Sequence, residues 1–192
     1  MRKRPKILVA GILDTKGNEV KYIAERVKVA GGDPTIFEVS VGKEVGWADI
    51  SLSEVISNAD INMDNFLKLG KTDRVNIIIK GGIKLVGKLI KDGKVDGIVA
   101  TGGSMGASIL TSIMQTMPIG MPKLMLTTMA SGNTSIYVGT KDISMMYPIA
   151  EVGINTVTRK ILNNAAGSIV GMCSIPKAVA EGEKEKPLIG CT

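Results

Sequence analysis

Short continuous apolar runs alternate along the chain with longer segments in which apolar residues recur every three or four positions. The continuous runs are typical of strands buried on both faces of a parallel sheet, and the spaced segments are typical of helices that bury one face. A strand, a helix and a second strand at the start of the chain predict a βαβ unit with parallel strands. The predicted strands are residues 6–11, 35–39, 95–100, 123–128 and 143–147.

Helices are predicted between and after these strands. The first follows a loop at residues 12–17 and ends at Gly31-Gly32, and the last begins where Asn155 can cap it. A long helix over residues 72–91 contains Gly81-Gly82, a pair that either weakens the helix or marks close packing. The pattern therefore alternates strands and helices, which predicts an α/β fold.

The length of 192 residues suits one hydrophobic core, and we expect one domain over residues 1–180. Residues 42–70 are polar and weakly periodic, so we expect an excursion there with a short helix capped by Ser51. Residues 181–192 combine a charged stretch with the start of an apolar run, which predicts a linker and the beginning of a missing downstream domain. We expect neither a signal peptide nor a membrane segment, and hence a cytoplasmic protein.

Composition narrows the possible chemistry. The chain has no histidine and two cysteines, which excludes a Ser-His-Asp triad within it and argues against a zinc site or a disulfide framework. A bound metal would then be a hard ion such as Mg2+, held by carboxylates and ligand phosphates. The net charge of +6 comes without a nucleic-acid-binding motif, and only 3% of residues are aromatic, so we expect no nucleic acid partner.

The stretch Gly102-Gly103-Ser104 lies between a predicted strand and a predicted helix. Glycine lets a ligand approach the backbone closely, and the first N–H groups of a helix have no partner inside the helix. The helix dipole adds partial positive charge there, which favours a phosphate. The stretch is a candidate anion-binding loop. It matches neither the P-loop nor the dinucleotide fingerprint, and this disfavours NAD.

Two further loops, at residues 11–17 and 128–142, are also rich in Gly, Ser, Thr and Asp. Loops at the carboxyl ends of parallel strands meet at one edge of the sheet, where ligands bind. We therefore expect the three loops to surround one site for a phosphate-bearing small molecule, although each alone is compatible with turns and helix caps. The candidate binding residues are Asp14, Thr15, Lys16, Gly102, Gly103, Ser104, Gly106, Thr128, Ser131, Gly132, Gly139, Thr140 and Asp142.

Six motifs follow one another along the chain: Leu13-Asp14-Thr15-Lys16-Gly17-Asn18-Glu19, Gly102-Gly103-Ser104-x-Gly106, Pro118-Ile119-Gly120-Met121-Pro122-Lys123, Thr128-x-Ala130-Ser131-Gly132, Tyr137-Val138-Gly139-Thr140-Lys141-Asp142-Ile143 and Asn163-Asn164-Ala165-Ala166. In this order they resemble the N-terminal ATP-binding domain of the plant tobamovirus-resistance protein family and its uncharacterised bacterial and archaeal relatives. The resemblance implies a Rossmann-like three-layer domain with a mostly parallel sheet and helices on both faces. It also implies that the domain binds ATP, with Mg2+ as a candidate ion bound together with the ATP, and that it forms a homodimer or larger homo-oligomer.

The resemblance assigns nucleotide binding to the same candidate residues. Two positions depart from the usual Gly-Gly-Ser-Gly-Gly-Thr loop, because Met105 replaces a glycine and Ala107 replaces a threonine whose hydroxyl could contact a phosphate. Three interpretations stay open. The domain binds a nucleotide, it transfers or hydrolyses a phosphoryl group with Asp14 or Asp142 as the catalytic residue or Mg2+ ligand, or it is a non-catalytic module that dimerises through residues 129–147.

Overall fold

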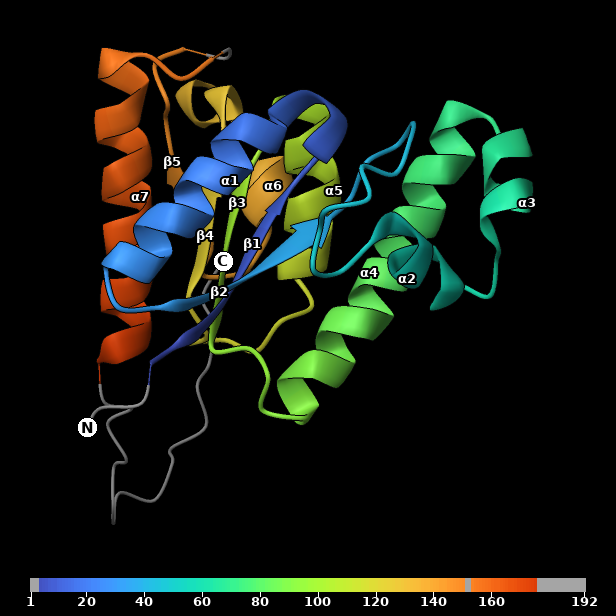
Figure 1. Cartoon of the computed structure of the whole chain (residues 1–192), viewed down its shortest axis with the longest axis horizontal. Helices are drawn as coiled ribbons and strands as arrows, with labels where there is room; N and C mark the ends of the chain where they lie inside the picture. The colour runs from blue at the N-terminus through green and yellow to red at the C-terminus, as the bar shows by residue number, and fades with distance from the viewer. Residues whose placement is uncertain (1–3, 151–152, 176–192) are drawn as a thin grey trace.

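Five parallel strands form one sheet in the order β2-β1-β3-β4-β5 (Figure 1). The structure is a computed structural model and describes residues 4–150 and 153–175, so the linker expected at 181–192 lies outside the described residues. Each strand begins and ends within two residues of its predicted bounds. The strands are β1 (Lys6–Gly11), β2 (Asp33–Glu38), β3 (Gly97–Thr101), β4 (Lys123–Leu126) and β5 (Ser144–Met146).

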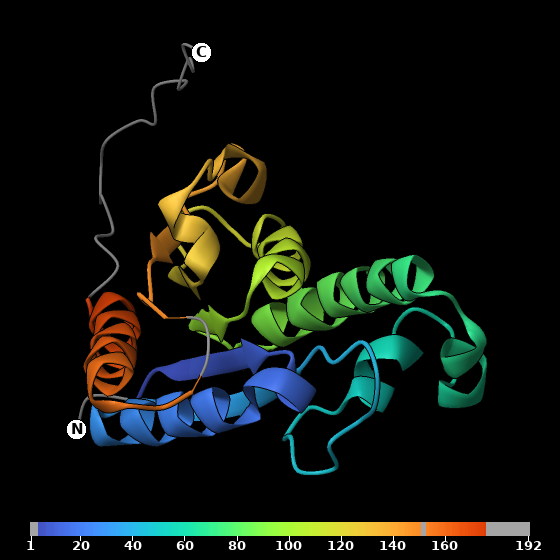
Figure 2. The ribbon, with the colours of Figure 1, turned by 90° about the horizontal axis from the view of Figure 1, so that it is seen from above.

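Helices cover both faces of the sheet, and the α/β, Rossmann-like three-layer fold is confirmed. Successive residues of β1 enter two separate hydrophobic clusters, Leu8 and Ala10 one of them and Ile7 and Val9 the other. The first cluster includes residues of α4 and α5, and the second includes residues of α1 and α7 (Figure 2). The helices are α1 (Leu13–Val29), α2 (Leu52–Ser57), α3 (Met63–Lys68), α4 (Lys71–Lys91), α5 (Ser104–Met114), α6 (Ser135–Val138) and α7 (Thr156–Ser174), with a 3-10 turn η1 (Thr128–Ser131).

Helices α1 and α7 pack side by side on one face of the sheet. The apolar stripe of α1 is fully buried, and the chain leaves this helix through Gly31, whose φ of +94° favours glycine. The side chain of Asn155 caps α7 by accepting hydrogen bonds from the backbone N–H groups of Val157 (2.8 Å) and Thr158 (3.0 Å). The end of α1 and the start of α7 therefore lie where the sequence predicts them.

The excursion over residues 42–70 forms the short helices α2 and α3, which lie beside α4 (Figure 1). Ser51 caps α2 as predicted, because its hydroxyl accepts a hydrogen bond from the backbone N–H of Glu54 (3.2 Å). Helix α2 buries Leu52 in the same hydrophobic cluster as the sheet residues. The excursion is thus packed on the main core rather than on a core of its own.

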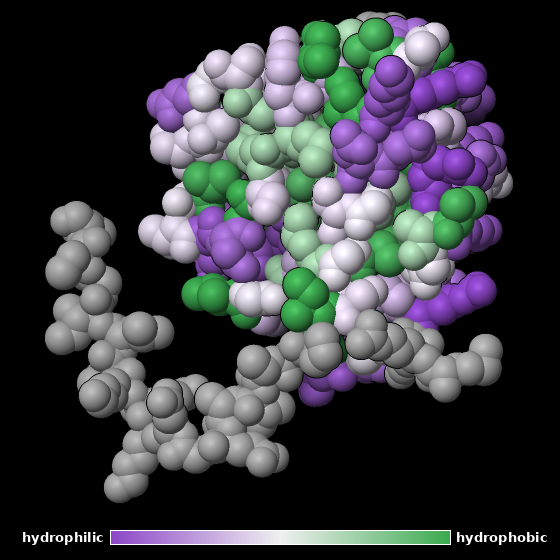
Figure 3. All heavy atoms as spheres, turned by 90° about the vertical axis from the view of Figure 1, so that its left-hand side faces the viewer, coloured by the Kyte–Doolittle hydropathy of each residue, from purple (hydrophilic) through white to green (hydrophobic). Residues whose placement is uncertain are grey.

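Helix α7 lies on the outside of the molecule, on the side that faces the viewer in Figure 3. Hydrophobic residues form small scattered groups on this face, while hydrophilic residues gather toward one side of it. No helix within residues 4–150 and 153–175 combines the length and the apolar character that crossing a membrane requires.

Candidate functional site

A crevice lies at the carboxyl ends of the strands, close to where the neighbouring strands β1 and β3 continue into helices on opposite faces of the sheet. Ligands of open α/β sheets bind at such a switch point. The open space between its walls is about 390 Å³, including its mouth. It is lined by Lys16, Glu19, Thr101, Gly102, Gly103, Leu126, Thr128, Pro148, Ala150, Gly153, Thr158 and Leu162.

The glycine loop after β3 forms one wall of the crevice. The backbone N–H of Gly102 donates a hydrogen bond to the carbonyl of Leu126 at the end of β4 (3.2 Å), which holds the loop against the neighbouring strand. Gly103 is the N-cap of α5 and provides no side chain to cap the first N–H groups of that helix. The wall therefore carries backbone donors and the positive end of a helix dipole.

The loop after β3 depends on glycine at position 102. A Cβ atom on Gly102 would lie 2.9 Å from the Cα of Gly106, and we expect Gly102→Ala to lower the free energy of unfolding by about 1–2 kcal/mol. Gly106→Ala is the matched control, because its Cβ would meet Ile12 side-chain atoms no closer than 3.5 Å and alanine favours a helix. Urea unfolding of both variants measures the difference, and equal losses would contradict this role of Gly102.

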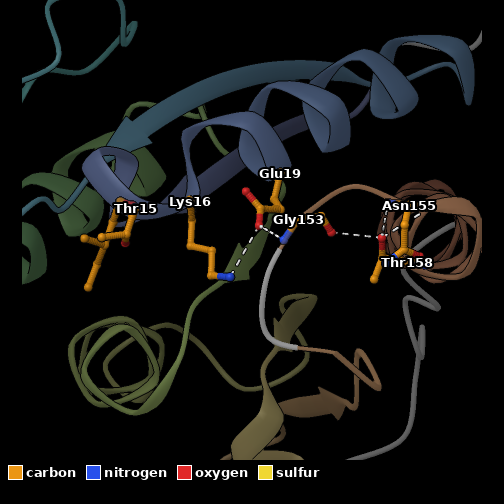
Figure 4. A network of polar contacts seen from close by, with 7 residues as sticks. Thr15, Lys16, Glu19, Gly153, Asn155 and Thr158 are labelled. Carbon is orange, nitrogen blue, oxygen red and sulfur yellow. Dashed lines mark hydrogen bonds and ion pairs between the residues drawn. The ribbon is translucent and has the colours of Figure 1, made fainter.

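Helix α1 forms the opposite wall and brings two charged side chains into the crevice. Residues 13–16, predicted as loop, are its first turn, and Lys16 interrupts the helix with φ −122° and ψ 17°. Nζ of Lys16 lies 3.3 Å from Oε1 of Glu19, with 13% and 12% of the side chains exposed. Oε1 of Glu19 also accepts a hydrogen bond from the backbone N–H of Gly153 (3.3 Å), which brings the chain before α7 to α1 (Figure 4).

The start of α1 is fixed from the end of β2. The backbone N–H of Leu13 donates a hydrogen bond to the hydroxyl of Ser40 (3.1 Å). The neighbouring Glu38 is fully buried, and this burial raises its pKa in spite of hydrogen bonds from Ser40 and from the backbone of Val45. These contacts hold the first turn of α1, and hence Lys16, beside the glycine loop.

The structure brings together some of the predicted binding residues. Lys16, Gly102, Gly103 and Thr128 line the crevice. Four others lie at the same edge of the sheet but do not line the crevice: Thr15, Ser104, Ser131 and Gly132. Gly106 faces Ile12 in the core. The binding roles of all these residues stay predictions.

Two predicted carboxylates do not reach the crevice. Asp14 lines a separate hollow with Gly42 and Arg74, and burial raises its pKa. Oδ1 of Asp142 lies 2.9 Å from Nζ of Lys123, the first residue of β4, and is therefore at the amino edge of the sheet. The expectation that the whole 128–142 loop lies at the carboxyl edge is wrong, because its last part returns the chain to the start of β5.

The other residues of this returning segment lie away from the crevice as well. Gly139 lies beside the side chain of Gln115, which follows the C-terminal end of α5, and Thr140 comes between Gly139 and Asp142. Burial alone would raise the pKa of Asp142, but hydrogen bonds from Lys123 and from the backbone N–H of Gly120 outweigh it and lower the pKa. Asp142 is thus a partner of a buried lysine.

The two departures from the usual loop sequence also lie outside the crevice lining. Ala107 is fully buried in the hydrophobic cluster beneath α4 and α5, so a hydroxyl at this position would face the core. Met105 lines the hollow that contains Asp14. Neither substitution changes the walls of the crevice described above.

Sequence reasoning missed several residues of the crevice. Glu19 follows Lys16 by three residues, a spacing that places both on one helix face. The sequence predicts a loop at 12–17, however, and helical spacing does not apply to a residue in a loop. The walls contributed by Pro148, Ala150 and Thr158 come from the chain after β5, and they reach the crevice because α7 packs on α1.

Residues 5–178 match the N-terminal domain of an uncharacterised protein family, UPF0261. The chain belongs to the UPF0261 family. A UPF0261 protein of Clostridium tetani is 38% identical over 192 residues, and one of Rhizobium meliloti is 38% identical over 189 residues. Each alignment covers 97% of this chain and 46% of the relative, so the chain spans about half the length of these bacterial UPF0261 proteins.

A plant protein is also similar to this chain, at a lower sequence identity. The ToMV susceptible protein tm-1(GCR26) of Solanum lycopersicum is 28% identical over 190 residues, which cover 88% of this chain and 25% of the plant protein. The resemblance to the plant family and its microbial relatives is therefore confirmed. The comparisons identify the UPF0261 domain without assigning it a ligand.

Proposed function

We propose that this UPF0261 domain binds a nucleotide, with ATP as the expected ligand, and that the crevice holds its phosphates. The observation that carries the proposal is the meeting of three features that favour an anion. They are the glycine backbone at 102–103, the N-terminus of α5 and the ammonium group of Lys16. All three lie at the switch point of the sheet, where ligands of this fold class bind.

A neighbouring hollow supports a ligand larger than a phosphate. It contains about 720 Å³ of open space and is lined by Asn18, Tyr22 and Ile154, among others. Glu19 and Gly153 line both this hollow and the crevice, so the two spaces adjoin along α1. We propose that the nucleoside part of the ligand occupies this hollow, and the resemblance to an ATP-binding domain favours adenosine.

The positions of the predicted catalytic carboxylates do not favour a phosphoryl-transfer enzyme. Asp14 lines a different hollow, and Asp142 pairs with Lys123 at the opposite edge of the sheet. General base catalysis requires a group within hydrogen-bond reach of the reacting proton. Nucleotide binding is therefore the function that this geometry supports best.

Isothermal titration calorimetry with ATP and Mg2+ tests the proposal. We expect the wild-type domain to bind ATP and Lys16→Met to weaken binding about ten- to hundredfold, because a hydrogen bond between charged groups contributes about 1.5–3 kcal/mol. Lys28→Met is the matched control, since Lys28 is exposed in the last turn of the same helix.

Thermal unfolding of both variants separates a loss of binding from a loss of folding. Trp47 provides a second signal, because it is the only tryptophan of the chain and its ring atom Cζ2 would lie 3.0 Å from a Cβ on Gly17, next to Lys16. Absence of heat and of any fluorescence change at millimolar ATP would reject nucleotide binding. Equal affinities of the two lysine variants would reject the role of Lys16.

A further inference from the structure

The crevice contains one negative side chain that the anion hypothesis does not use. Among the lining residues that the structure describes, Glu19 is the only carboxylate and Lys16 the only cationic side chain. Because the two form an ion pair at 3.3 Å, their charges offset each other, and this pair provides no net positive charge for a polyphosphate. The remaining attraction comes from the backbone donors and the dipole of α5.

A bare polyphosphate and Glu19 would repel each other. Only 12% of the Glu19 side chain is exposed, so water screens this repulsion less than it would at the surface. A divalent cation between the carboxylate and the phosphates turns the repulsion into attraction. Mg2+ in nucleotide sites is commonly held in this way, by one or two carboxylates together with phosphate oxygens and water.

We propose that Glu19 makes the crevice select the magnesium complex of the nucleotide over the free nucleotide. The inference rests on the proposed nucleotide binding and names the residue that accommodates the cation. Asp14 and Asp142, the carboxylates predicted for this role, lie elsewhere, as described above. Within the described part of the chain, no group of three or more His, Cys, Asp or Glu side chains could hold a metal ion, and in this proposal Glu19 holds the cation together with the phosphates.

The contacts of Glu19 are compatible with this role. Its interactions with Lys16 and with the backbone N–H of Gly153 both involve Oε1. A carboxylate has acceptor sites on both oxygen atoms, so the same side chain can serve Lys16 and a cation. Glu19 would thereby connect the cation to the ammonium group that contacts the phosphates.

The competing role of Glu19 is to hold Lys16 in position. Glu19→Gln separates the two roles, because a glutamine oxygen still accepts hydrogen bonds from Lys16 and Gly153 but carries no charge. Glu54→Gln is the matched control, since Glu54 is exposed on α2 and lines neither the crevice nor the neighbouring hollow. ATP is titrated calorimetrically into each variant and into the wild type, once with Mg2+ and once with EDTA.

For the wild type and Glu54→Gln we expect Mg2+ to tighten ATP binding at least about tenfold relative to EDTA. For Glu19→Gln we expect this ratio to fall to about one, with binding in EDTA at least as tight as that of the wild type. The inference would be overturned if Mg2+ tightened ATP binding to Glu19→Gln as strongly as to the wild type, or if Mg2+ did not change ATP binding to the wild type. Either result would leave nucleotide binding intact. Absence of ATP binding in every sample would overturn both.

Discussion

Gly81→Ala is expected to lower the free energy of unfolding by about 3 kcal/mol, the largest loss that we predict for a change of one methyl group. A Cβ on Gly81 of α4 would lie 2.0 Å from the carbonyl oxygen of Val55 in α2. This atom belongs to the backbone of a helix whose residues Leu52 and Ile56 are fully buried, so α2 would have to shift as a whole. For a domain of this size we expect the melting temperature to fall by about 6–12 °C.

The same helix provides a graded set of controls. A Cβ on Gly82 would meet the flexible end of Ile113 at 2.5 Å, and one on Gly87 would meet nothing within 4 Å. Gly82→Ala should therefore cost less than Gly81→Ala, and Gly87→Ala should stabilise the domain by about 0.5–1 kcal/mol because alanine is the better helix former. Urea unfolding followed by circular dichroism checks this order, and a Gly81→Ala variant as stable as Gly87→Ala would contradict the close packing of α2 on α4.

The sequence pattern predicts most of the fold because local signals and tertiary contacts agree. The apolar runs became the five strands, and Asn155 and Gly31 mark helix termini by their side-chain and backbone chemistry. The sequence could not decide between the two explanations of Gly81-Gly82, because a pair of glycines is compatible with a weakened helix and with close packing. The backbone of Val55 decides for close packing, and it lies more than twenty residues away in the chain.

The candidate site is less predictable, because it depends on how each crossover returns to the sheet. The residues directly after β1 and β3 reach the carboxyl edge, as the strand directions require. The chain between β4 and β5 leaves the sheet at the carboxyl edge and returns to it at the amino edge. Composition does not show that Thr128 lies at the first of these edges and Asp142 at the second. ATP, Mg2+ and a homodimer stay predictions, since they concern ligands and partners rather than the path of this chain.

Lys123→Met is expected to lower the free energy of unfolding by about 3 kcal/mol. The Lys123 side chain is fully buried, and its three ammonium protons match three acceptors. Nζ lies 2.8 Å from the carbonyl oxygen of Pro118, 2.7 Å from that of Met121 and 2.9 Å from Oδ1 of Asp142. Methionine has a similar volume but removes the donor from both carbonyl groups. The carbonyl of Pro118 keeps a hydrogen bond from the backbone N–H of Met121 (3.3 Å), whereas a carbonyl left without a partner costs about 1–3 kcal/mol.

Asp142→Asn isolates the ionic part of this interaction and predicts its pH dependence. The carboxylate is 41% exposed, so solvent screens the pair and we expect a loss of only about 1 kcal/mol at pH 7. Because the pKa of Asp142 is lower in the folded than in the unfolded state, its contribution is present above the unfolded value and disappears as the pH falls through the folded value. The stability difference between wild type and Asp142→Asn should therefore shrink on acidification from pH 7 toward pH 3, as measured by urea unfolding at each pH. A difference that stays constant over this range would show that the charge of Asp142 does not stabilise the buried lysine.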